Sequence, residues 1–102
     1  MERKLDPKAA ISKAKAIVLD MFAGESPQDV GLEEIRYDEE SGLWVVIIGF
    51  SRPWDAPINR HSVVRTGFSD LFPRRSYKIV RISDETGEWL SLTEYDFENK
   101  KQ

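Results

Sequence analysis

The chain has 102 residues, no Cys, one His and a formal net charge of −3. A chain of this length forms one domain, and the lack of Cys excludes disulfide frameworks, thiolate zinc sites and thiol nucleophiles. With 40% hydrophobic residues the chain is too apolar to be wholly disordered, so a packed core is expected. One His also excludes paired-His metal motifs, and we expect neither a metal nor a cofactor.

Residues 6–24 are predicted to form a helix. Asp6 can cap its start, Pro7 suits the first helical position, and Gly24 suits a left-handed C-terminal stop. The apolar residues recur at helical spacing and form one stripe, made of Ile11, Ala14, Val18, Met21 and Phe22. This pattern is typical of a helix that lies on a sheet.

Strands are predicted after a loop over residues 25–31, at about 32–38, 43–51, 76–83 and 88–97. The segment 43–51 is apolar on both faces, which indicates a central strand. In the last strand, alternation places Leu90 and Leu92 on one face and Trp89, Tyr95 and Phe97 on the other. The predicted fold class is α+β: one N-terminal helix packed on a four-stranded antiparallel sheet in α-β-β-β-β order, with a long loop between the second and third strands.

The two predicted hairpins share a pattern. Residues 36–44 and 81–89 match in register, so that Gly42 corresponds to Gly87 and Trp44 to Trp89. Gly at this place predicts a positive φ that closes each turn. We expect the acidic side chains of both turns to be solvated, a group that comprises Asp38, Glu39, Glu40, Asp84, Glu85 and Glu88.

The stretch 77–90 reads Tyr-Lys-Ile-Val-Arg-Ile-Ser-Asp-Glu-Thr-Gly-Glu-Trp-Leu, an alternating strand, an acidic turn that ends in Thr-Gly, and a return strand. This stretch resembles the PepSY pattern, and the helix and first hairpin are more loosely similar to small α+β modules of the PepSY and cystatin-like type. The resemblance implies the fold and a regulatory or binding role. The inhibitory Gln-x-Val-x-Gly loop of cystatins is absent, so protease inhibition is not implied.

Charge is uneven along the chain. Residues 1–51 carry a balance of −4 and residues 79–102 a balance of −3, whereas residues 52–78 carry +4. The positive block coincides with the loop 52–75, and connections of this length are usually functional or disordered. Arg and Trp often carry interface energy. The candidate binding residues of this loop are Arg52, Trp54, Arg60, His61, Arg65, Arg74 and Arg75.

We therefore predict a small cytoplasmic, non-enzymatic module that binds another protein. One alternative is a small-ligand binder or enzyme with a pocket under the loop, around Arg52, Trp54 and His61. A catalytic set of His61 with Asp55 and Ser62 is disfavoured because no nucleophile-elbow motif is present. Nucleic-acid binding through the basic loop is disfavoured by the acidic balance of the whole chain.

The second sheet face is a further candidate. One helix covers one face of a sheet, so the other face needs the long loop or a second subunit as cover. The aromatic residues assigned to this interface are Trp44, Trp89, Tyr95 and Phe97, and a homodimer is one predicted partner arrangement. The longest apolar run, residues 43–50, is too short to cross a bilayer, and the polar N-terminus does not read as a signal peptide.

Overall fold

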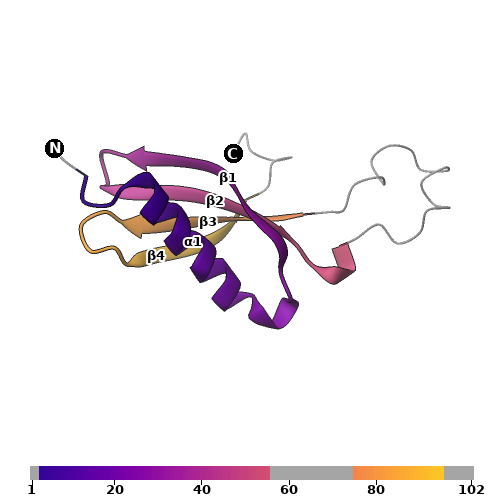
Figure 1. Cartoon of the computed structure of the whole chain (residues 1–102). Helices are drawn as coiled ribbons and strands as arrows, with labels where there is room; N and C mark the ends of the chain where they lie inside the picture. Colours follow the sequence, from indigo (N-terminus) through magenta and orange to yellow (C-terminus); the bar gives the residue numbers. More distant parts are fainter. Residues whose placement is uncertain (1–2, 56–74, 96–102) are drawn as a thin grey trace, which may run out of the picture.

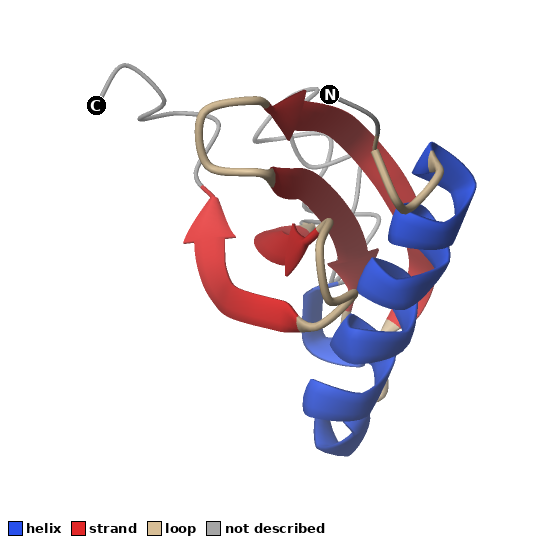
Figure 2. Cartoon of the chain, turned by 90° about the vertical axis from the view of Figure 1, so that its left-hand side faces the viewer, coloured by secondary structure: helices blue, strands red, loops and turns tan. Residues whose placement is uncertain are grey.

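A computed structural model describes residues 3–55 and 75–95 of the chain. Within these ranges the fold is α+β, with one long helix against an open four-stranded antiparallel sheet in the order β1-β2-β3-β4 (Figures 1 and 2). This arrangement confirms the predicted fold class. The elements are α1 (Pro7–Met21), the 3-10 turn η1 (Ala23–Glu25), β1 (Gln28–Asp38), β2 (Leu43–Ser51), the 3-10 turn η2 (Pro53–Asp55), β3 (Ser76–Ser83) and β4 (Trp89–Tyr95).

Helix α1 begins as its sequence predicts and ends earlier. The Asp6 carboxylate accepts a hydrogen bond from the Ala9 N–H at 2.7 Å, and a Pro opens the first turn. The helix ends at Met21, and Phe22 follows it with its ring centroid 5.3 Å from that of Phe50. The left-handed residue after the helix is Ser26, at φ 52°, so the predicted stop at Gly24 is wrong.

The strand bounds of β2 and β3 agree with the prediction, whereas β1 begins at Gln28 inside the predicted loop. Two register shifts between β1 and β2 let this irregular stretch continue the pairing, so that Gln28 still lies opposite Ser51. Asp29, at φ 54°, lies at the first of these irregularities. Pairing with a central strand has therefore overridden the turn-like composition of this segment.

Alternate residues of β2 form the core under the helix. Trp44, Val46, Ile48 and Phe50 are all buried, and small residues on α1 let the helix approach the sheet closely. The remaining buried members of this cluster are Ala10, Ala14, Val18, Val80 and Ile82. Burial of each large side chain here stabilises the fold by about 1.5–3 kcal/mol.

The predicted helix stripe is only partly correct. Ala14 and Val18 are fully buried, but Met21 is 50% exposed, and Ala10 takes a core position that the stripe did not include. Spacing of four residues from Ala10 to Ala14 to Val18 keeps the buried side chains on one line along the helix.

Both hairpin turns use Gly as predicted. Gly42 has φ 70° and Gly87 has φ 78°, and each N–H donates to a backbone carbonyl of its own turn at 2.8 Å. The acceptors are the carbonyls of Asp38 and Ser83, at matching positions in the two hairpins. Gly adopts these φ values at the lowest cost because it has no Cβ, which is why both turns favour it.

Candidate protein-binding groove between α1 and β4

Asp84 ties the two turns to the start of the helix. It is 6% exposed, and its carboxylate accepts hydrogen bonds from the N–H groups of Lys4 (2.7 Å) and Leu5 (2.8 Å) and from the Trp44 indole N–H (2.9 Å). Its own N–H donates to the Gly42 carbonyl at 3.0 Å. The expectation that this carboxylate is solvated is therefore wrong. Its partners lie up to 80 positions away along the chain, so no local pattern could have revealed them.

The hydrogen bonds decide the protonation state of Asp84. Burial raises the pKa of this carboxyl, but the backbone donors at Leu5 and Lys4, the Trp44 indole and the Lys4 charge together outweigh burial and lower the pKa below its ordinary value. Asp84 is therefore a structural anion, with the donors on its carboxylate already supplied by the fold.

Trp44 belongs to the core and not to an exposed interface. It is 3% exposed under α1, and its ring lies 5.1 Å from the ring of Tyr37. The Arg3 guanidinium covers the pair, 4.4 Å from the Tyr37 ring centroid. The sequence placed Trp44 in a sheet-face interface because alternation alone does not show which face a helix covers.

Trp89 and Tyr95 do not share a face, contrary to the prediction. Trp89 lies opposite Ile82, which points to the helix, whereas Tyr95 lies opposite Tyr77 on the other side of the sheet. A register shift between Arg81 and Ile82 separates them, because it inserts an extra residue into β4 and reverses the alternation from there on. Leu92 consequently faces the helix, in register with Val80.

The sheet face away from α1 is largely covered along its central strand. Val45 is 7% exposed and Ile47 is 5% exposed. The register places Arg36 and Arg81 on either side of Val45, and aliphatic Arg stems can shield apolar neighbours. Self-association through this face stays a prediction.

A groove opens on the helix side, where α1 and β4 diverge. It encloses about 440 Å³ and is lined by Lys13, Ala16, Ile17, Gly87, Glu88 and Trp89. Helix α1 packs chiefly on β1, β2 and β3, so the groove runs between the outer flank of the helix and the last strand. Trp89 remains 40% exposed there, and the adjacent Leu90 is 59% exposed.

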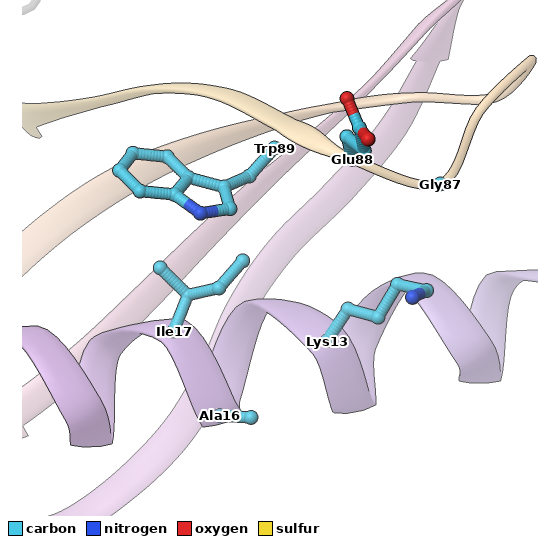
Figure 3. A pocket seen from close by; sticks show the side chains of 6 residues that line it. All are labelled: Lys13, Ala16, Ile17, Gly87, Glu88 and Trp89. Carbon is cyan, nitrogen blue, oxygen red and sulfur yellow. The ribbon is translucent and has the colours of Figure 1, made fainter.

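Figure 3 shows how the groove is built. The Trp89 ring stands over Ile17, with the edge that carries the indole nitrogen turned toward the helix, and Lys13 lies on the same side one turn earlier. The Glu88 carboxylate points away from the helix. Within residues 3–55 and 75–95, neither the Lys13 ammonium nor the Trp89 indole N–H has a hydrogen-bond or ion-pair partner. The groove thus combines an apolar lining with two donors that have no partner in the described part of the chain.

The predicted loop residues that the structure describes lie at the other end of the sheet and do not converge. Arg52 Nη1 lies 3.2 Å from Glu25 Oε1, and its guanidinium lies 5.3 Å from the ring of Trp54, which is 62% exposed. Arg75 instead donates to the Ser51 hydroxyl at 3.3 Å and to the Asp29 carbonyl at 2.9 Å.

Arg52 lies over the Phe50 ring, which is on the helix side of the sheet. Ser51, the partner of Arg75, is the next residue of β2 and points to the opposite face. Arg52 and Arg75 therefore lie on opposite faces of the sheet. The remaining predicted site residues lie outside the described ranges: Arg60, His61, Arg65, Arg74 and Phe97.

No helix within residues 3–55 and 75–95 has the length and apolar character needed to cross a membrane. No group of three or more His, Cys, Asp or Glu side chains is placed there to hold a metal ion.

The fold and the groove define a small α+β module with an apolar groove beside β4, the last strand in the order of the described sheet. Comparison with protein families, with curated proteins and with solved structures finds no match to this chain. The resemblance to PepSY and cystatin-like modules stays a prediction.

Proposed function

We propose that this protein is a small, non-enzymatic binding module that recognises another protein through the groove between α1 and β4. The observation that carries the proposal is Trp89, which forms one wall of the groove while 40% exposed. Trp is enriched among the few residues that dominate interface energies, because its large ring loses a great deal of water contact when a partner covers it.

The neighbourhood of Trp89 supports a protein partner. Leu90 adds a second exposed apolar side chain on the same strand. Strand β4 is the last in the order of the described sheet, and such an edge offers backbone donors and acceptors to an incoming strand. A partner segment that pairs with β4 would thus form backbone hydrogen bonds and bury Trp89 at the same time.

The alternative functions depend on residues outside the described ranges. A ligand pocket under the 52–75 loop needs His61, and nucleic-acid binding needs Arg60, Arg65 and Arg74. These alternatives, the homodimer and the cytoplasmic location stay predictions.

A photo-crosslinking amino acid, introduced into the protein in the cells that produce it, tests the proposal. At Ala16 it would stand in the groove, and at Glu34 it would stand exposed on the opposite sheet face. We expect a discrete adduct from position 16 and none from position 34. The partner, identified by mass spectrometry and purified, should then bind the unmodified protein directly. Adducts from position 34 alone would place the interface on the opposite face and refute the groove.

A further inference from the structure

Trp44 is a buried tryptophan whose indole N–H is held by a carboxylate. Trp44 donates its indole N–H to Asp84, and the same carboxylate is stabilised by backbone N–H groups and by the charge of Lys4. Trp44 thus shows one way in which the indole N–H of a tryptophan on the helix side of the sheet is satisfied: by a carboxylate at the edge of an apolar cluster, with a positive charge nearby.

Trp89 occupies the matching position of the second hairpin, and no carboxylate within residues 3–55 and 75–95 accepts from its indole N–H. Both tryptophans face the helix side, since Trp44 and Trp89 each lie opposite Ile82 on its two flanking strands. The Trp89 indole N–H and the Lys13 ammonium have no hydrogen-bond or ion-pair partner among the residues that the structure describes, and the nearby Glu88 carboxylate points away from the helix. Two unengaged donors, one of them positive, favour an anionic acceptor.

We infer that the groove recognises an acidic side chain in an extended segment of the partner protein, with an apolar residue next to it. The inference rests on the proposed function and specifies the chemistry of its ligand. The carboxylate accepts from the Trp89 indole N–H, as Asp84 does from the Trp44 indole N–H. The flexible Lys13 side chain adds an ammonium that pairs with the same carboxylate. The adjoining apolar side chain packs against Ile17, and the backbone of the segment pairs with β4.

Geometry favours a peptide segment over a free anion. The groove encloses about 440 Å³, far more than a carboxylate occupies, and most of its lining is apolar. An ion alone would leave that lining exposed, whereas a segment with an acidic and an apolar residue uses both parts of the surface.

The test uses two capped tripeptides, leucine-aspartate-leucine and leucine-asparagine-leucine, which differ in one charge. The indole N–H signals of Trp44, Trp54 and Trp89 are followed by heteronuclear NMR as each peptide is added to the full chain. We expect the aspartate peptide to shift the Trp89 signal in a saturable manner and to leave the other two unchanged. We expect the asparagine peptide to bind at least about threefold more weakly, because it cannot pair with a cation.

Three variants sharpen the assignment. Lys13→Gln should weaken the aspartate peptide by about threefold and remove its advantage over the asparagine peptide, whereas Lys8→Gln, an exposed change on the same helix, should not. Trp89→Phe keeps an apolar ring, removes the donor and should likewise reduce the preference for aspartate. Binding to this variant is followed by the backbone amide signals of Ile17 and Gly87, which line the groove. A higher salt concentration should also reduce the difference in affinity between the two peptides, because salt screens the charge interaction.

Each contrary result has a definite meaning. Equal affinities for the two peptides, with a shift at Trp89, would overturn the acidic specificity and leave the groove as a binding site. No shift at Trp89 with either peptide would overturn the inference, and the crosslinking result at Ala16 would still decide the proposed function. A Trp89 shift that grows with protein concentration alone, with a doubled mass in sedimentation, would make a second copy the occupant and overturn the assignment to another protein.

Discussion

The two hairpins carry the same turn pattern and place their tryptophans in different environments. Trp44 is 3% exposed and bonded to Asp84, whereas Trp89 is 40% exposed and faces an open groove. The difference in exposure comes from the residues that surround each ring. The first tryptophan packs with buried residues of α1 and bonds to Asp84 in the second turn, and no equivalent turn follows the second tryptophan among the described residues. The same local sequence thus supplies a structural residue in one place and an interaction surface in the other.

The largest expected effect is on the buried tryptophan. Trp44→Ala should lower the free energy of unfolding by about 3–5 kcal/mol, because it opens a cavity in the core and leaves Asp84 without one donor. Trp89→Ala should lower it by about 1 kcal/mol or less, since a large part of that ring is already in water. Urea unfolding measures the free energy of unfolding of both variants. Equal decreases would contradict the view that Trp44 is a core residue and Trp89 a surface residue.

The second effect compares the acidic residues that match in the two turns. Asp84→Asn should destabilise the fold clearly, because the carboxylate accepts three hydrogen bonds from the N-terminal segment and Trp44. Glu39→Gln, the corresponding change in the first turn, should alter the urea midpoint little, since Glu39 is exposed and makes a single 3.9 Å ion pair with Arg3. Similar midpoint shifts for the two variants would show that Asp84 is not the anchor.

The third prediction concerns pH. The pKa of Asp84 is lowered in the folded protein by its donors. Its contribution to stability is therefore fully present above the unfolded pKa, about 4, and is lost as pH falls through the folded value. The free energy of unfolding is measured for the native chain and for Asp84→Asn at neutral pH and in acid. The difference between the two free energies should shrink as pH falls below about 4. A constant or widening difference would contradict the lowered pKa.

The smallest effects separate two glycines. Gly87→Ala should cost about 1 kcal/mol, because φ is 78° there and a side chain at that φ is strained. Gly24→Ala should be neutral or slightly stabilising, since a methyl group there meets open space and φ is not in the left-handed region. Thermal melting measures both changes: the melting temperature should fall for Gly87→Ala and stay the same or rise slightly for Gly24→Ala. Equal falls would contradict the different roles of the two glycines.

Local signals predicted much of the fold. The Asp6 cap, the bounds of β2 and β3, and the Gly turns depend on neighbouring residues, and the structure confirms them. The early start of β1 and the bulge in β4 depend on pairing with another strand, which periodicity within one strand does not contain.

The candidate site was harder to predict for the same reason. Trp89 could be singled out as an exposed aromatic, but its face depends on the bulge, and the groove depends on where α1 crosses the sheet. Lys13 and Ile17 appear in the sequence as ordinary helix positions, and only the packing of α1 beside β4 brings them to Trp89. The role of Asp84 likewise needs a segment from the opposite end of the chain.

The most direct test of the central claim measures the affinity of the partner captured at Ala16 for two tryptophan variants. Trp89→Ala should weaken binding by at least about tenfold, as expected for an aromatic interface anchor. Trp54→Ala, which removes an even more exposed ring at the other end of the sheet, should leave the affinity unchanged. Equal affinities for the native chain and Trp89→Ala would contradict the groove as the binding surface.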